Sequence, residues 1–302
     1  MLKKQFLSIL MLFYSPLLLF YSSFVFGEKT LSCEIQGGLG NQLFQIATTL
    51  ATAWDHDYAP IFPRLSNSPS FLSPRPVYWS TLFTQLPTQQ EHAFDHFLRY
   101  IELKDTFSPI ALEGSSIKLV GYWQSPKYFD HHRDRILSFI QPIPSLADDI
   151  EQRFQVLVQK HTGSVVSMHL RRGDYMLLDD FMCLWQERYK QYYLKAVSYF
   201  PEETLFMVFS DDPAYAKHFF YSNFPTCKAV FPKEEDYVEL YLMAKCDHAI
   251  IANSTFSWWG AYLNTNSHKI VISPKEWTVT HSQGVYRPDF LPSDWITISV
   301  FK

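Results

Sequence analysis

The segment Ser164-Val165-Val166-Ser167-Met168-His169-Leu170-Arg171-Arg172-Gly173-Asp174-Tyr175 sets the architecture that we expect for the rest of the chain. Its first part is a short apolar run with β-branched residues, which predicts a buried strand. Arg171 and Arg172 follow that strand, and the several N–H donors of their permanently charged, planar guanidinium groups suit the oxygens of a diphosphate. Gly173 permits a sharp turn, and Asp174 can hold one arginine in place. The alternative interpretation is an exposed Arg–Asp ion pair on a loop, which contributes little.

Strands and helices alternate in the chain beyond the arginines. We expect helices over 189–200 and 236–246, strands over 204–209, 248–252 and 269–272, and a further helix that starts after Asn253. This alternation predicts a parallel sheet with helices on both faces. Asp236, with Glu239 three residues later, has the pattern of a capping box at a helix start.

Polar residues follow three of these strands in succession. The three strand ends carry Arg171-Arg172-Gly173-Asp174, Ser210-Asp211-Asp212 and Asn253-Ser254-Thr255. Ligands of an open parallel sheet bind beyond the carboxyl ends of its strands. Arginines suit a diphosphate, carboxylates suit ribose or base donors, and hydroxyls at a helix start suit further anionic oxygens. Together the three strand ends predict a nucleotide-diphosphate site.

The first half begins with a strand near 31–36 and the glycine-rich turn Gly37-Gly38-Leu39-Gly40-Asn41-Gln42. The run from Leu43 to Trp54 has helical spacing, so the turn presents backbone N–H groups at a helix start, which suits an anion or a polar ligand. The competing interpretations are a tight structural turn and a dinucleotide-binding turn, whose last glycine is replaced here by Leu43. Proline-rich loops over 55–116, a strand over 117–123 and a helix over 148–160 complete this half. Its aromatics Trp79, Tyr122 and Trp123 either stack on a sugar or fill the core.

Composition limits the partners of the chain. Its 302 residues suffice for one large core or two ordinary domains. A net charge of −4 predicts no general attraction to nucleic acid, so any phosphate must be held by a local cluster. The four cysteines lack metal-binding spacing, and we expect free thiols. Asp55-His56-Asp57 and Asp130-His131-His132 are interpreted as a solvated helix end and a solvated helix face, so no metal site is expected.

The N-terminus differs from the remainder of the chain. Lys3 and Lys4 precede the apolar stretch 6–27, which is long for a secretory signal and sufficient to span a bilayer. Residues 1–28 are therefore either a cleaved signal peptide or a retained membrane anchor, and they are excluded from the fold. The lysines favour a cytoplasmic start with the rest of the chain across the membrane, in the secretory pathway, although the cytoplasmic membrane face stays open.

Several of these runs together resemble the α-1,2-fucosyltransferases of glycosyltransferase family 11. The resemblance rests on the runs at 37–42, 121–125, 169–175, 209–212, 253–259 and 274–277, and it covers about 31–280. It implies an α/β, GT-B-like fold of two Rossmann-like domains with parallel sheets, with an acceptor-binding domain over 29–160 and a GDP-fucose-binding domain over 161–302. It also implies inverting, metal-independent transfer of L-fucose from GDP-β-L-fucose to O2 of a terminal β-galactoside, without a cofactor.

The resemblance also assigns roles to residues. It implies that Arg171 and Arg172 contact the pyrophosphate, with Arg172 as the first choice for the catalytic role. It also implies that His169 orients the loop 171–174, here called the arginine loop. Asp174 is either a general base or a structural partner of Arg172. The remaining predicted donor-binding residues are Gly38, Gly40, Asn41, Gln42, Ser210, Asp211, Asp212, Asn253, Ser254, Thr255 and Ser257. The alternatives are a protein O-fucosyltransferase and a non-catalytic GDP- or glycan-binding protein.

Overall fold

The computed structural model describes residues 29–71, 73–104, 106–177, 186–280 and 283–301. The predicted signal peptide or anchor, residues 1–28, lies outside these ranges and stays a prediction. Within the described ranges, no helix combines the length and the apolar character that crossing a bilayer requires. The described cysteines Cys33, Cys227 and Cys246 are free thiols, whereas Cys183 lies outside the described residues.

The first half contains a parallel sheet of four strands in the order β2-β1-β8-β7. These strands are β1 (Thr30–Cys33), β2 (Ala59–Pro60), β7 (Leu98–Ile101) and β8 (Ser116–Val120). The strand expected over 117–123 ends at Val120 because Gly121 has φ +147° and leaves the extended conformation.

The second half contains a parallel sheet of six strands in the order β11-β10-β9-β12-β13-β16. They are β9 (Val165–Leu170), β10 (Leu205–Ser210), β11 (Lys228–Val230), β12 (His248–Ile250), β13 (Val271–Pro274) and β16 (Ile296–Ile298). All residues of β9 are buried, as its apolar run predicts. In register, Leu170 pairs with Ser210 and Ile250 pairs with Met168, so the ends of β9, β10 and β12 meet at one edge.

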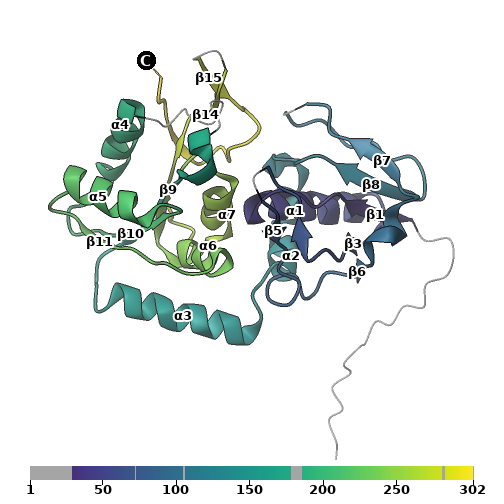
Figure 1. Cartoon of the computed structure of the whole chain (residues 1–302), viewed down its shortest axis with the longest axis horizontal. Coiled ribbons are helices and arrows are strands. Elements are labelled where there is room, and N and C mark those ends of the chain that lie inside the picture. The colour runs from purple at the N-terminus through teal and green to yellow at the C-terminus, as the bar shows by residue number, and fades with distance from the viewer. Residues whose placement is uncertain (1–28, 72, 105, 178–185, 281–282, 302) are drawn as a thin grey trace, which may run out of the picture.

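Seven helices surround these sheets in the described residues (Figure 1). They are α1 (Leu39–Asp55), α2 (Arg133–Phe139), α3 (Pro144–Val158), α4 (Gln186–Val197), α5 (Pro213–Asn223), α6 (Asp236–Lys245) and α7 (Thr255–Leu263). Helix α3 crosses from one half to the other along the lower edge of Figure 1, and the predicted boundary near 160 falls between α3 and β9. The domain limits themselves stay a prediction.

Short elements complete the described chain. Three small two-stranded sheets pair β3 (Phe62–Pro63) with β6 (Thr88–Gln89), β4 (Asn67–Ser68) with β5 (Arg75–Pro76), and β14 (Glu276–Thr280) with β15 (Gln283–Tyr286). The 3-10 turns are η1 (Glu91–Phe94), η2 (Pro126–Tyr128), η3 (Asp130–His132) and η4 (Gly173–Leu177).

Helix α7 packs into the core of the first half, although it belongs to the second half in sequence. Trp258 and Trp259 are fully buried, with ring centroids 4.5 and 5.3 Å from that of Phe44 in α1. Trp123 is also buried in this core, so of the three aromatics considered for sugar stacking only Tyr122 is exposed. The two halves therefore share a large aromatic contact, and α1 and α7 lie side by side in Figure 1.

The expected capping box at the start of α6 is wrong. The N-cap of the helix is Glu235, without a side-chain cap, and Asp236 instead accepts a hydrogen bond from the Tyr78 hydroxyl of the first half. The Glu239 carboxylate accepts from the backbone nitrogen of Glu234 at 3.2 Å. A long-range partner therefore replaces the local one that the spacing predicted.

Candidate active site

The arginine loop forms directly at the carboxyl end of β9. Leu170 is the last residue of the strand, and η4 begins at Gly173. Gly173 has φ +26°, and a Cβ atom there would lie 3.1 Å from Cγ of Asp211, so a side chain would push this carboxylate away. Glycine is therefore required for the close approach of the arginine loop to the end of β10 as well as for the turn itself.

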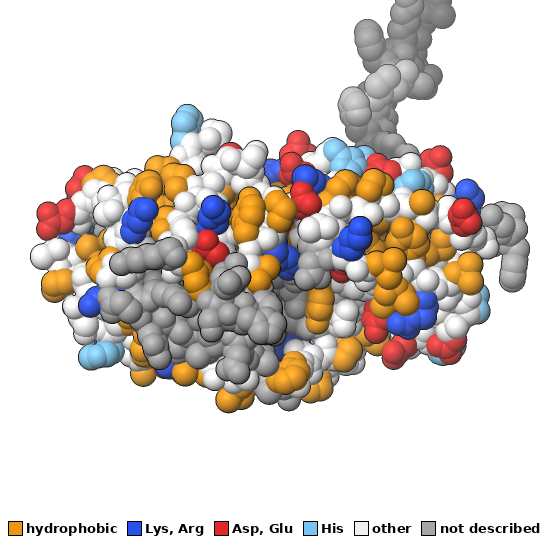
Figure 2. Space-filling model, turned by 90° about the horizontal axis from the view of Figure 1, so that it is seen from above, with side chains coloured by type: hydrophobic (Ala, Val, Ile, Leu, Met, Phe, Trp, Pro, Cys, Tyr) orange, Lys and Arg blue, Asp and Glu red, His pale blue; other side chains and the backbone are white. Residues whose placement is uncertain are grey.

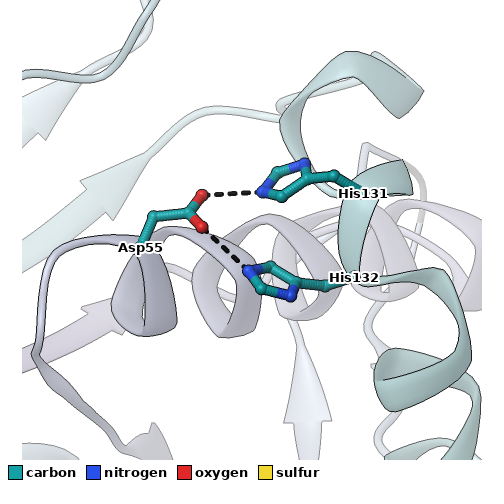
Figure 3. A group of neighbouring side chains, drawn as sticks. All are labelled: Asp55, His131 and His132. Atoms are coloured by element: carbon teal, nitrogen blue, oxygen red, sulfur yellow. Dashed lines mark hydrogen bonds and ion pairs between the residues drawn. The ribbon is translucent and has the colours of Figure 1, made fainter.

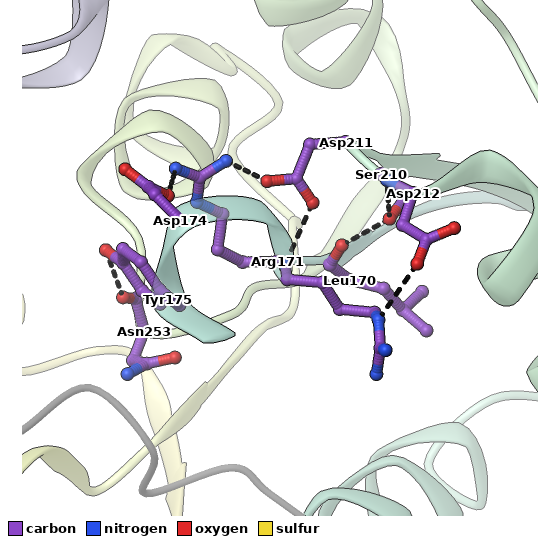
Figure 4. A network of polar contacts seen from close by, with 9 residues as sticks. Leu170, Arg171, Asp174, Tyr175, Ser210, Asp211, Asp212 and Asn253 are labelled. Atoms are coloured by element: carbon purple, nitrogen blue, oxygen red, sulfur yellow. Dashed lines mark hydrogen bonds and ion pairs between the residues drawn. The ribbon is translucent and has the colours of Figure 1, made fainter. Parts of the chain in front are cut away.

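Arg171 is held between two carboxylates (Figure 4). Its guanidinium forms ion pairs with Asp174 of η4 and with Asp211 at the end of β10, and it lies 4.8 Å from the ring centroid of Tyr175. The Arg171 side chain is only 18% exposed. Asp174 is thus a partner of Arg171, not of Arg172 as the sequence had suggested, and it holds that guanidinium in a fixed direction.

Arg172 lies against the start of α5. Its Nε donates to Asp212 at 3.1 Å, and its guanidinium carbon is 3.5 Å from the ring centroid of Tyr215. Asp212 also caps α5, because its Oδ1 accepts from the backbone nitrogen of Tyr215 at 3.1 Å. The two guanidiniums therefore contact different elements. Asp211 pairs with the Arg171 guanidinium and also accepts from the Arg172 backbone nitrogen at 2.9 Å.

Ser210 and the two aspartates after it support the arginines. The Ser210 hydroxyl donates to the Leu170 carbonyl at 2.6 Å and accepts from the Asp212 nitrogen at 3.0 Å, which ties the end of β10 to the end of β9. The prediction that these residues touch the nucleotide stays a prediction. Their described contacts hold Arg171 and Arg172 in place.

His169 is the buried residue beneath the arginine loop. It is 6% exposed, its ring is 5.8 Å from that of Phe256, and its Nδ1 has no hydrogen-bond partner among the described residues. Burial, assisted by the positive charge of Arg171, lowers the pKa of His169 to about 3, so the ring is neutral near pH 7. A buried nitrogen without a partner costs about 1–3 kcal/mol, which a hydrogen bond to a bound ligand would recover.

The third strand end is connected to the arginine loop through Tyr175. The Tyr175 hydroxyl donates to the Asn253 carbonyl at 3.2 Å, while its ring contacts the Arg171 guanidinium. The Asn253 amide donates to the Trp277 carbonyl at 2.9 Å. Ser257 donates to the carbonyl of Ser254 at 3.3 Å. Asn253, Ser254 and Ser257 are all buried at the start of α7, so their observed contacts fix this helix start next to the arginines.

The glycine-rich turn of the first half meets the same helix start. A Cβ atom on Gly40 would lie 2.5 Å from the backbone nitrogen of Phe256, so α1 and α7 touch backbone to backbone. The Asn41 side-chain oxygen accepts from the Thr255 hydroxyl at 2.9 Å and from the Gln124 amide at 2.9 Å. Asn41 therefore joins the two halves at the start of α7.

The other glycine-turn residues have different surroundings. Gly38 is the N-cap of α1 and has open space where a side chain would be, as a ligand-facing position requires. Gln42 is completely buried and donates to the carbonyls of Gly37 and Pro76 and to Ser68 at 3.0–3.1 Å. These contacts fix the glycine-rich turn in place, and the expectation that Gln42 binds the donor stays a prediction.

The charges of the site do not by themselves attract an anion. Three carboxylates face two guanidiniums in the ion pairs around Arg171 and Arg172, which gives a formal charge of −1, and His169 is neutral. Figure 2 likewise shows acidic and basic side chains interspersed over the face that it presents. A diphosphate would therefore compete with these carboxylates for the N–H donors of the two arginines.

The sequence matches the family model described as "Glycosyl transferase family 11" over residues 26–299. The chain belongs to glycosyltransferase family 11. The recognition of this family from the motifs at the strand ends and in the glycine-rich turn is therefore confirmed.

Within the family, the chain is similar to bacterial and mammalian proteins. It is 35% identical over 188 residues to the O-antigen biosynthesis glycosyltransferase WbnK of Escherichia coli, and the match covers 60% of each chain. It is 30% identical over 189 residues to an alpha-1,2-colitosyltransferase of E. coli, and this match covers 61% of this chain and 63% of the relative. It thus spans about three fifths of these relatives. It is 24% identical over 298 residues to the galactoside 2-alpha-L-fucosyltransferase Sec1 of Mus musculus, covering 90% of this chain and 74% of the relative.

A solved structure supports the fold of this family 11 chain. The fucosyltransferase NodZ from Bradyrhizobium superposes with a TM-score of 0.50 at 15% sequence identity, over 77% of this chain and 92% of that chain. At this level of identity the likeness concerns the fold alone. It confirms the expected GT-B-like arrangement of parallel α/β sheets.

Some contacts of the candidate site had no signal in the sequence. The Gln124 side chain accepts from Arg287 at 2.8 Å and donates to Asn41, so Arg287 also lies at the contact between the two halves. Tyr215 is found only through its contact with Arg172. Burial raises the pKa of Glu239 to about 7, and the Asp211 carboxylate acts in the same direction. The contacting residues are far apart in sequence, so no local motif could reveal which of them meet.

Proposed function

We propose that this family 11 chain transfers L-fucose from GDP-β-L-fucose to O2 of a terminal β-galactoside, with inversion and without a metal ion. The proposal is carried by the two arginines at the carboxyl end of β9, whose loop contacts Asn253 at the start of α7 through Tyr175. Thr255 of the same helix start contacts Asn41 of the glycine-rich turn. The name of the mouse relative, a galactoside 2-alpha-L-fucosyltransferase, supports the sugar, the acceptor and the linkage.

The chemistry requires stabilisation of the leaving group. When the bond between the fucose anomeric carbon and the phosphate oxygen breaks, negative charge develops on the departing GDP. A guanidinium held at that oxygen stabilises the charge, and losing one such donor typically costs on the order of 10²–10³ in rate. In this proposal the arginines supply the charge neutralisation for which other transferases use a metal ion.

The two arginines have different roles in this proposal. Arg171 is fixed by Asp174 and Asp211, whose side chains are 19% and 25% exposed. Asp212, the partner of Arg172, is 40% exposed, and an ion pair with a more exposed carboxylate is weaker. Arg172 is therefore the guanidinium that most easily exchanges its carboxylate for a phosphate, which supports its predicted catalytic role. Nδ1 of His169 gains its missing partner from the bound donor.

The donor sugar has one specific competitor. The E. coli relative at 30% identity is named an alpha-1,2-colitosyltransferase, so a GDP-linked deoxysugar related to fucose is the second candidate donor. Both candidates share the diphosphate and the α-1,2 linkage. The assay therefore compares GDP-fucose with GDP-colitose, each with lactose as acceptor and with a chelator present, and the product linkage is assigned by NMR.

The expected result is GDP release with GDP-fucose and an α-1,2-linked product in the presence of the chelator. A strict preference for GDP-colitose would show that the donor sugar is colitose and not fucose. An absolute requirement for a metal ion, or transfer to a folded peptide domain but not to lactose, would contradict the proposal.

The arginine role is tested with two variants. Arg172→Ala should lower the transfer rate on the order of 10²–10³-fold with little change in melting temperature. Arg99→Ala, which removes an exposed arginine paired with Glu34 in the first half, is the matched control and should transfer at the wild-type rate. Wild-type activity of Arg172→Ala would show that Arg172 is not catalytic, and unfolding of the variant would assign Arg172 a structural role instead.

A further inference from the structure

Two short motifs that looked unrelated in the sequence meet in the fold. Asp55 is the last residue of α1, and His131 and His132 lie in η3, 76 and 77 positions later. Each motif alone was interpreted as solvated because further ligands were missing from its neighbourhood in the sequence. In the fold, each motif supplies candidate ligands that the other lacks.

The three side chains converge on one point (Figure 3). Nε2 of His131 lies 2.8 Å from one Asp55 carboxylate oxygen, and Nε2 of His132 lies 2.8 Å from the other. The ligand atoms of all three residues are within 4.8 Å of one another. The side chains of His131, Asp55 and His132 are 48%, 36% and 27% exposed, so an ion can reach them from solvent.

The surroundings hold η3 in position. The His132 ring contacts the Trp54 ring at 5.3 Å, edge to face, and Trp54 precedes Asp55 in α1. On either side of the histidines, Asp130 accepts from the Tyr262 hydroxyl at 2.7 Å, and Arg133 donates to the Tyr262 carbonyl at 2.7 Å. The backbone of η3 is thus fixed against α1 and α7 before any ion binds.

Two imidazole nitrogens and one carboxylate oxygen form a donor set for a first-row divalent metal such as Zn²⁺. Mg²⁺ and Ca²⁺ prefer oxygen ligands only. Zinc lies about 2.0–2.2 Å from such atoms, so neighbouring ligand atoms are roughly 3.3 Å apart in a tetrahedral site. The two imidazole nitrogens each lie 2.8 Å from a different oxygen of the Asp55 carboxylate, and all ligand atoms lie within 4.8 Å of one another, so rotations of these partly exposed side chains bring three of them to tetrahedral separations around one ion.

We propose that Asp55, His131 and His132 bind one Zn²⁺ ion, with water as the fourth ligand, and that this ion ties the end of α1 to η3. The site is separate from the proposed transfer site. Asp55 is fourteen residues beyond Asn41 in α1, which at 1.5 Å per residue is about 21 Å along the helix axis. The ion is therefore expected to affect the stability of the first half and not the transfer chemistry.

The test measures metal binding directly. The full chain, purified without a histidine tag and stripped with a chelator, is titrated with ZnCl₂ and separately with MgCl₂ by calorimetry, and its melting temperature is recorded with each ion. We expect one Zn²⁺ bound per chain and a higher melting temperature with Zn²⁺ than with Mg²⁺. A wild-type chain that binds no Zn²⁺ stoichiometrically would overturn the proposal, and the Asp55–imidazole contacts would then be hydrogen bonds only.

Variants locate the ion. Asp55→Asn, His131→Gln and His132→Gln should each weaken Zn²⁺ binding by roughly 100-fold or more, because loss of an outer-shell partner alone costs 10–100-fold. His218→Gln removes an exposed imidazole of α5 outside this cluster and should bind Zn²⁺ as the wild type does. Circular dichroism in chelator confirms that each variant is folded. Undiminished binding by the three cluster variants, or loss of binding in His218→Gln, would place the ion elsewhere.

Discussion

The Gly40→Ala substitution tests the contact that joins the two halves at the proposed active site. The new Cβ would lie 2.5 Å from the Phe256 nitrogen and 2.7 Å from the Thr255 carbonyl oxygen, and both are backbone atoms that cannot rotate away. Helices α1 and α7 must therefore separate by about 1 Å to reach an ordinary contact distance, and such overpacking costs about 3 kcal/mol. The better helix propensity of alanine returns about 1 kcal/mol. The expected net loss of stability is about 2 kcal/mol.

The expected loss corresponds to a melting temperature lower by roughly 4–8 °C. Separation of the helices also breaks the 2.9 Å hydrogen bond from Thr255 to Asn41, so the transfer rate should fall in step with stability. Thermal unfolding followed by circular dichroism and the GDP-release assay measure the two effects.

Gly38→Ala provides the matched control for this experiment. Gly38 has φ −72°, and no atom lies within 4 Å of the position its Cβ would take. Its stability should stay within about 1 kcal/mol of the wild type. A Gly40→Ala protein that melts with the wild type, or a larger loss for Gly38→Ala, would refute the argument that α1 and α7 are in backbone contact.

Two further predictions concern α6. Tyr78→Phe removes the hydrogen bond to Asp236 and leaves a partly buried carboxylate without that donor, so urea denaturation should show a loss of about 1 kcal/mol. The exposed control Tyr221→Phe should show none. Burial raises the pKa of Glu239 from 4.5 to about 7 in the folded chain. The protonated carboxyl therefore contributes fully to the free energy of unfolding below pH 4.5, and this contribution is lost as pH rises through 7. Glu239→Gln should therefore be more stable than the wild type at pH 8 and similar at pH 4.5; equal melting temperatures at both pH values would contradict the raised pKa.

The sequence predicted those features that depend on local pattern. The apolar run before His169 predicted β9, and the alternation after it predicted a parallel sheet. Because parallel strands end at a common edge, the polar residues after β9, β10 and β12 were correctly expected to lie together. The pairing of Asp174 with Arg171, not Arg172, depends on the turn at Gly173, which the pattern of residue types does not encode.

The features that the sequence did not predict are contacts between distant segments. The role of Asp236 is set by Tyr78, and the surroundings of Asp55 are set by His131 and His132. Gln42 looked like part of a ligand-binding turn, yet the fold buries it against the chain around Ser68. Neither propensity nor spacing contains this information, because each of these positions acquires its partner only when the tertiary structure forms.

The insertion of α7 into the core of the first half constrains how this protein is made. Asn41 and its partner Thr255 are 214 positions apart in the sequence, and Phe44 and its partner Trp258 are equally far apart. A ribosome adds about 5–20 residues per second, so the nascent N-terminal sheet spends roughly ten seconds or more with exposed aromatic side chains. Expression of residues 29–160 alone should therefore yield an aggregating fragment, and chaperones that shield apolar surface should raise the yield of the intact polypeptide.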